Sequence, residues 1–150
     1  MSTQPQTLEQ ECERRDKTRH REATQFFKFI LSYSEAFKDH LAHPRNAGEL
    51  ADANAAAEET NPVCGDRLRL SLRIHDGRIE AARFLAYGCP PTLASGSALA
   101  EMLEGMTVED ALKLTRKEIV NVLGGLPARK QHAAALAIET LQVALEIAGQ

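Results

Sequence analysis

An alternating run of apolar and polar residues, followed by a tight turn, is the feature that most constrains the fold of this chain. From Arg67 to Ile74, leucine or isoleucine occupies every second position, which is the period of a strand with one buried face. Asp76-Gly77 suits a two-residue hairpin turn, and Ile79 to Tyr87 return as the partner strand. A β-bulge is expected near Ala81-Ala82, where the alternation shifts. The sequence therefore predicts an antiparallel hairpin.

Helical patterns lie on both sides of this hairpin. An upstream apolar run has near-helical spacing and ends at His43-Pro44, because proline disfavours helix in the residue before it. Downstream, Pro90-Pro91 suits a first helical turn and Gly105 can end that helix. Helices are expected at about 26–41, 90–104, 107–114, 117–123 and 126–145. The polar, alanine-rich stretch at 51–60 is expected to be a surface loop.

Composition limits the class of protein. With 150 residues, 43% of them hydrophobic, the chain can bury one core. We expect a charged N-terminal extension at 1–24, either a solvated helix or a disordered arm, and one domain at 25–150. The net charge of −3 argues against nucleic acid as the main partner. Because neither an export signal nor a membrane-spanning stretch is recognised, the expected location is the cytoplasm, away from membranes.

Two of the three cysteines flank the predicted hairpin. Cys64 lies in Asn-Pro-Val-Cys-Gly-Asp, and Cys89 lies in Tyr-Gly-Cys-Pro-Pro-Thr, so a hairpin would bring both sulfurs to the same end of the sheet. An odd cysteine count without an export signal favours reduced thiols over disulfides. The third, Cys12, stands in the charged tail and is expected to have no role.

Asp66 and His132 are candidate partners of these thiols. Asp66 follows Cys64 after one glycine, so the two side chains can project the same way from an extended backbone. Cys89 directly precedes a helix, whose positive end favours the thiolate. His132 stands in the first turns of the last helix, where the same dipole favours the neutral ring. Two sulfurs, one carboxylate and one imidazole suit zinc or iron.

Simpler interpretations remain open for each of these residues. A lone cysteine is most often a small buried side chain, Asp66 can cap a turn, and His132 can be a surface residue. The close C-x-x-C pairing that indicates zinc is missing from the sequence. Serine-based catalysis is disfavoured, since Ser95 and Ser97 do not form a G-x-S-x-G elbow.

Several segments of the chain, taken together, resemble one known family. Their order and spacing are similar to those of the iron–sulfur cluster assembly scaffolds of the IscU/NifU/SufU type, from about Tyr33 to the C-terminus. The matching segments are Tyr33-Ser34-Glu35, His40 to Gly48, Asn61 to Asp66, Ala82-Arg83-Phe84, Tyr87-Gly88-Cys89, Ala94 to Ser97 and Leu126 to His132.

This resemblance implies an α+β fold, in which an antiparallel sheet of about three strands is covered by helices. It implies a scaffold rather than an enzyme, with iron or a [2Fe-2S] cluster bound by Cys64, Asp66, Cys89 and His132. Lys130 matches a lysine that neighbours the site. A cysteine desulfurase would deliver sulfur, recipient apoproteins would take the cluster, and a chaperone would engage the segment from Leu126 to Lys130.

The chain departs from the family pattern at two places. Ala133 stands where a third cysteine usually follows the histidine, and alanine has no lone pair to offer a metal. Pro90-Pro91 replaces smaller residues after Cys89. The alternative to a scaffold is therefore a mononuclear zinc protein that regulates a cysteine desulfurase or relays its sulfur. A metal-independent interaction module ranks third, and self-association into a homo-oligomer stays open.

Overall fold

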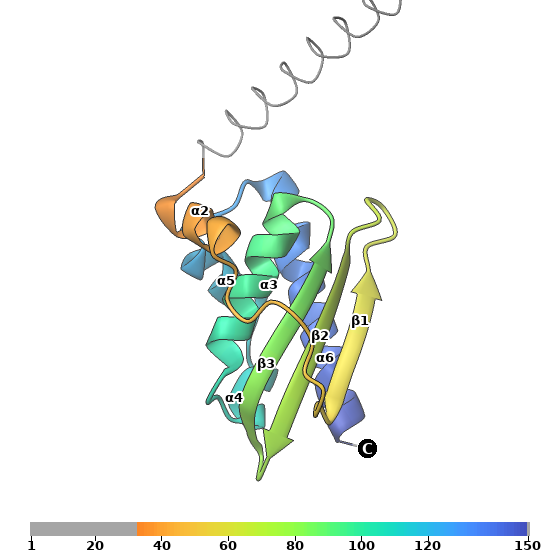
Figure 1. Ribbon diagram of the computed structural model, residues 1–150. Coiled ribbons are helices and arrows are strands. Elements are labelled where there is room, and N and C mark those ends of the chain that lie inside the picture. Colours follow the sequence, from red (N-terminus) through yellow and green to blue (C-terminus); the bar gives the residue numbers. More distant parts are fainter. Residues whose placement is uncertain (1–32, 150) are drawn as a thin grey trace, which may run out of the picture. The chain divides into compact units, whose positions relative to one another are not determined.

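The structure is a computed structural model that describes residues 33–149, and Figure 1 shows its helices and strands. The extension predicted at 1–24 lies outside the described residues, as do Cys12 and residues 26–32 of the upstream apolar run. The α+β fold class predicted from the sequence is confirmed for the part of the chain that is described.

The sheet of the described part has three antiparallel strands in the order β1-β2-β3, namely β1 (Ala55–Thr60), β2 (Arg67–His75) and β3 (Arg78–Tyr87). The predicted hairpin is confirmed as β2–β3. Asp76 and Gly77 have φ values of 50° and 72°, so both central residues of the turn have positive φ, as hairpin turns of type I′ require. The register shifts opposite Arg73 and Ile74, which leaves Glu80 as the extra residue of a bulge one position before the expected place.

The prediction of a surface loop at 51–60 is wrong, because β1 occupies residues 55–60. Ala55 and Ala57 are buried, whereas Glu58 and Thr60 are exposed, and β1 pairs with β2 along its whole length. Alanine and glutamate have low intrinsic preference for strands. The strand forms because the small alanine side chains fit beneath helix α6 while the backbone completes its hydrogen bonds on β2.

The predicted helices are present within the described residues, with two differences. They are α2 (Glu35–Ala42), α3 (Pro90–Leu103), α4 (Val108–Leu112), α5 (Arg116–Val122) and α6 (His132–Ala148). Tyr33 and Ser34 fall inside the helix expected at 26–41 but are not helical, and the first described helix begins only at Glu35. The final helix begins at His132 instead of opening at Leu126. The residues before it contain a separate 3-10 turn, η1 (Ala128–Lys130), in which the Lys130 amide donates to the Pro127 carbonyl at 2.8 Å.

The core lies between the sheet and two helices. Leu68, Leu70 and Leu72 of β2 are fully buried, and α3 and α6 lie side by side against that face of the sheet (Figure 1). Gly96 brings α3 close to β3, since a Cβ atom at this position would lie 2.6 Å from the Phe84 ring. Close contact between helix and sheet therefore fixes where α3 begins.

The segment between α2 and β1 covers the opposite face. It bonds to the edge of β3 at Phe84, where the Gly48 amide donates at 2.8 Å and the Asn46 carbonyl accepts at 3.0 Å. It then runs past the arginines of β2, where Glu49 pairs with Arg69 at 2.6 Å. None of the helices within residues 33–149 combines the length and hydrophobicity needed to cross a lipid bilayer.

Candidate metal centre

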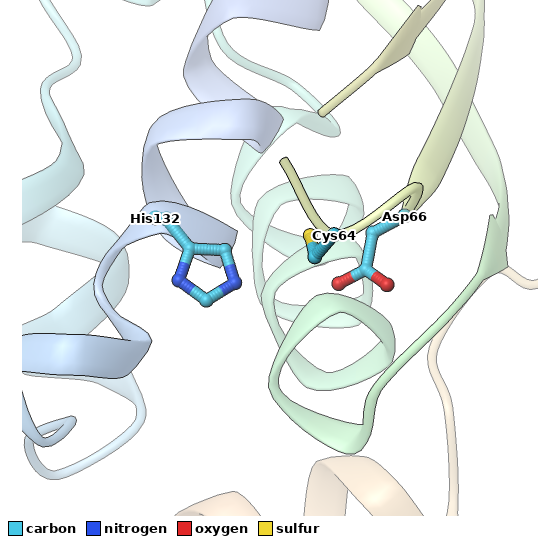
Figure 2. A group of neighbouring side chains, drawn as sticks. All are labelled: Cys64, Asp66 and His132. Carbon is cyan, nitrogen blue, oxygen red and sulfur yellow. The ribbon is translucent and has the colours of Figure 1, made fainter. Parts of the chain in front are cut away.

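Three of the four predicted ligands meet at one end of the sheet. Candidate ligand atoms of Cys64, Asp66 and His132 all lie within 4.8 Å of one another, and Figure 2 shows the imidazole facing the thiol and the carboxylate. The antiparallel topology produces this meeting, because β1 and β3 end where β2 begins. Helix α6 starts at the same end.

The loop between β1 and β2 presents Cys64 to solvent. The Asn61 side chain accepts a hydrogen bond from the Val63 amide at 2.9 Å, and the Asn61 carbonyl accepts one from the Gly65 amide at 2.8 Å. Gly65 has a φ of +77°, which glycine adopts without strain. These bonds hold the loop in a compact turn with the exposed Cys64 at its tip.

Asp66 lies beneath this loop and is only 6% exposed. Its Oδ2 atom accepts a hydrogen bond from the Thr92 hydroxyl at 2.8 Å and another from the Cys89 thiol at 3.1 Å. Its Oδ1 atom lies directly against Gly88, where a Cβ atom would come within 2.2 Å. The carboxylate is thus held between the start of α3 and the backbone that leads to it.

The carboxylate of Asp66 is stabilised in its charged form. Burial raises the pKa of Asp66, but hydrogen bonds from Cys89, Thr92 and Cys64 outweigh that effect and leave the pKa below its usual value. Asp66 is therefore ionised at neutral pH and can attract a cation to the exposed thiol beside it.

Cys89 lies beside this group and is joined to it through Asp66. It is the residue before the first turn of α3, as predicted. The expected preference for the thiolate is wrong for the metal-free site, because burial raises the pKa of Cys89 and the Asp66 carboxylate adds to the rise. A helix start lowers a thiol pKa only where desolvation and a nearby negative charge do not outweigh it. A metal ion would have to displace this proton.

His132 is the first residue of α6. Its Nδ1 atom lies 3.0 Å from the Arg129 carbonyl, so we assign the ring proton to Nδ1. Metal-binding histidines commonly donate one ring N–H to a carbonyl in this way. The assignment leaves the Nε2 lone pair for a ligand.

Lys130 and Ala133 both lie near His132 in the sequence, but only Lys130 has a side chain with a polar group. Lys130 belongs to η1 and is half-buried, so it neighbours His132 along the chain as expected. Ala133 is fully buried in the core and supplies no ligand atom to the group.

Sequence reasoning missed Thr92 and Gly88, which hold Asp66 in place. Thr92 stands in the first turn of α3, three residues after Cys89, and this helical spacing is the signal that relates the two side chains. Gly88 could have been suspected only because it directly precedes a candidate ligand. The contact of both residues with Asp66 depends on tertiary structure.

The donor set fits a transition metal. Thiol, carboxylate and imidazole groups are the ligands that zinc and iron sites use. The fold and the site together define a small α+β domain that gathers such groups at one end of an antiparallel sheet. The family model described as the NifU-like N-terminal domain matches residues 32–147. The chain belongs to this family, as the resemblance implied.

Individual relatives agree with this assignment. The chain is 41% identical over 113 residues to "Iron-sulfur cluster assembly scaffold protein IscU 1" of Archaeoglobus fulgidus, with 75% of this chain and 74% of that protein covered. It is 41% identical over 118 residues to the IscU scaffold of Aquifex aeolicus, with 77% and 75% covered. The crystal structure of a putative scaffold for the SUF system from Fervidobacterium islandicum has the same fold. Its TM-score is 0.63 at 22% identity, with 75% of this chain and 96% of that chain covered.

Proposed function

We propose that this protein is an iron–sulfur cluster assembly scaffold that binds iron or a [2Fe-2S] cluster and passes it to recipient apoproteins. The observation that carries the proposal is the meeting of Cys64, Asp66 and His132 within 4.8 Å, with Cys89 hydrogen-bonded to Asp66. The names of the relatives, which describe cluster assembly scaffolds, support it. The protein acts by binding and handing over its cargo, not by catalytic turnover.

The ligand types suit a cluster that must leave again. Thiolates are the usual ligands of iron–sulfur clusters, and histidine can replace cysteine on one iron of a [2Fe-2S] centre. Asp66 is a harder and weaker ligand for such a cargo than a thiolate is. A site with two sulfurs, one oxygen and one nitrogen therefore binds a cluster less firmly than four cysteines would.

Sulfur delivery by a cysteine desulfurase would use Cys64. Ala133 has no thiol, so the two candidate acceptors of the delivered sulfur among the described residues are Cys64 and Cys89. Cys64 is exposed at the loop tip, whereas Cys89 is half-buried and its pKa is raised by burial. The exposed segment at 127–129, next to the site, is where a chaperone would bind during release.

Anaerobic reconstitution with ferric iron and sulfide tests the proposal, since two ferric ions and two sulfides form the oxidised [2Fe-2S] cluster without a further oxidant. The wild-type protein should develop the visible absorbance of a cluster, and Cys64→Ala or Cys89→Ala should abolish it, because each removes one of two sulfur ligands. Cys12→Ala is the matched thiol control and should keep the chromophore. Failure of the wild-type protein to develop any chromophore would defeat the proposal.

A second candidate is a mononuclear zinc protein that regulates a desulfurase or relays its sulfur. The observation that favours it is the buried Ala133 beside His132, since zinc needs no third thiol when a carboxylate and an imidazole are present. Metal analysis of protein purified without oxygen separates the two functions. One bound zinc per chain that iron and sulfide cannot displace would support this alternative.

The variant Ala133→Cys tests whether the missing third thiol limits the rate of cluster formation. If two sulfurs suffice, Ala133→Cys should leave desulfurase-dependent cluster formation nearly unchanged. A large gain in the rate of cluster formation would instead show that the natural chain assembles clusters poorly. That result would favour the function as a zinc protein or sulfur relay. Because Ala133 is fully buried, the free energy of unfolding of the variant must be measured alongside.

A further inference from the structure

The Thr92 side chain lies between two of the proposed ligands. Its Oγ1 atom is 2.8 Å from Asp66 Oδ2 and 3.4 Å from Cys89 Sγ. Thr92 is fully buried, and its amide donates to the Cys89 carbonyl at 3.0 Å. Backbone and side chain together therefore hold the hydroxyl in a fixed place, out of contact with solvent.

Metal binding changes which groups can hold the Asp66 carboxylate. In the metal-free protein, Oδ2 accepts hydrogen bonds from both Thr92 and Cys89. A cysteine sulfur that binds a metal has released its proton to solvent, so Cys89 can then no longer donate. Of the two side-chain donors to Oδ2 in the described structure, Thr92 is the one that remains.

The other side of the carboxylate is bounded by backbone. Oδ1 lies against Gly88, where even a methyl group would approach within 2.2 Å. The carboxylate therefore has Gly88 on one side and the Thr92 hydroxyl on the other. This arrangement keeps one carboxylate oxygen within 4.8 Å of the Cys64 and His132 ligand atoms.

We propose that Thr92 is a positioning residue for metal binding, which holds the Asp66 carboxylate toward Cys64 and His132 when a cation occupies the site. The inference rests on the proposed function, because it requires that the site bind a metal. Groups that orient a metal ligand in this way typically contribute a factor of about 10 to 100 in metal affinity.

Anaerobic titration of the reduced, metal-free protein with Co²⁺ tests this role. Thr92→Val removes the hydroxyl and keeps the side-chain shape, and we expect Co²⁺ to bind roughly tenfold more weakly. The sulfur-to-cobalt absorption bands should persist at saturation, since both cysteines remain. Thr92→Ser restores the hydroxyl and should restore most of the affinity. If Thr92→Val does not fold, Thr92→Ala carries the same test, because alanine favours helix.

Thr140→Val is the matched control. Thr140 is also fully buried, and its hydroxyl donates to the Leu136 carbonyl within α6 at 2.8 Å. It lies about 12 Å along the helix from His132, so this variant should bind Co²⁺ as tightly as the wild-type protein does. An equal loss of affinity in both variants would overturn the proposal, since any buried threonine would then have the same effect.

A double-variant cycle separates positioning from general packing. If Thr92 acts through Asp66, Thr92→Val should cause little further loss in an Asp66→Ala background. A full tenfold loss in that background would overturn the proposal. So would an unchanged affinity of Thr92→Val in a wild-type background that binds Co²⁺. If the wild-type protein itself binds no Co²⁺, the proposed function fails, which is a distinct result.

Discussion

At the scale of single residues, Gly88 shapes the site through the side chain it lacks. Its φ of +151° is one that residues with a Cβ atom rarely adopt, and a Cβ atom would lie 2.2 Å from Oδ1 of Asp66. The 6% exposure of Asp66 leaves the carboxylate little room to move away. Glycine here therefore serves both the turn into α3 and the placement of a proposed ligand.

Gly88→Ala should lose stability for two reasons, backbone strain and collision with Asp66. The strain alone is worth about 1–3 kcal/mol, and the collision should add to it and weaken Co²⁺ binding. Gly105→Ala is the control, because Gly105 has a φ of +84° and a Cβ atom there would have no neighbour within 4 Å. Urea denaturation measures both variants. Equal losses of stability, with Co²⁺ affinity unchanged, would show that the collision has no effect.

At the scale of elements, the contact of α3 with the sheet decides where the helix start and its ligands lie. Gly96 of α3 approaches Phe84 of β3 and Leu68 of β2, and its Cβ atom would lie 2.6 Å and 3.0 Å from them. Phe84 is 1% exposed and Leu68 is fully buried, so neither can withdraw into solvent. The helix therefore depends on a small residue at this contact.

Gly96→Ala should destabilise the protein even though alanine favours helix. Alanine would gain up to about 1 kcal/mol in helix propensity, but overpacking a core typically costs about 1–3 kcal/mol. We expect a net loss of about 1 kcal/mol in the free energy of unfolding, as the difference of these ranges. The double variant Gly96→Ala/Phe84→Leu should lose less stability than the two single variants lose together, because the smaller side chain at position 84 makes room for the alanine. Losses that simply add would contradict the proposed contact.

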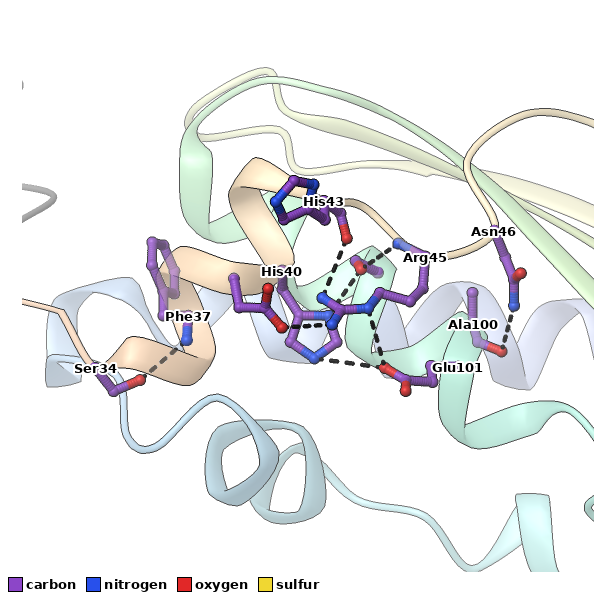
Figure 3. A network of polar contacts seen from close by, with 10 residues as sticks. Ser34, Phe37, His40, His43, Arg45, Asn46, Ala100 and Glu101 are labelled. Atoms are coloured by element: carbon purple, nitrogen blue, oxygen red, sulfur yellow. Dashed lines mark hydrogen bonds and ion pairs between the residues drawn. The ribbon is translucent and has the colours of Figure 1, made fainter.

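At the scale of the whole molecule, a buried histidine ties α2 and the segment after it to α3 (Figure 3). Nδ1 of His40 lies 2.8 Å from the Ser97 hydroxyl, which also accepts the Arg45 amide at 2.8 Å. Nε2 of His40 lies 3.6 Å from a Glu101 carboxylate oxygen. Burial lowers the pKa of His40, and Arg45 lowers it further, whereas Glu101 and Asp39 act in the opposite direction. The neutral ring is therefore the form that the fold favours.

The stability of the whole protein should consequently fall as the pH drops below about 6.5, the ordinary pKa of histidine. The unfolded chain then binds a proton that folded His40 resists, so unfolding becomes more favourable toward low pH. The acids with lowered pKa titrate below the range from pH 5 to pH 7, and Cys89, whose pKa is raised, titrates above it. Urea midpoints between pH 5 and pH 7 measure the slope.

Two variants test whether His40 is responsible for this slope. His40→Gln should flatten the dependence of the urea midpoint on pH, because glutamine does not titrate. His75→Gln replaces a histidine whose side chain is 71% exposed and should keep the slope of the parent protein. An unchanged slope in His40→Gln would show that another group is responsible.

The sequence by itself determined the elements whose signals are local. The alternation of β2, the Asp76-Gly77 turn and the helix-starting prolines of α3 act through neighbouring residues, so these elements were predicted nearly as they stand. Cys64, Asp66 and His132 were likewise chosen from residue type and spacing, and the structure brings them together. Their role as metal ligands stays a prediction.

Only the tertiary structure decided β1, the support of Asp66 and the protonation of Cys89. The alanines of β1 lack strand preference and become a strand through pairing with β2. Thr92 and Gly88 matter because they contact a carboxylate from another part of the chain. Burial beside that carboxylate raises the pKa of Cys89 against the helix dipole. Each depends on contacts between residues distant in sequence, which local pattern does not encode.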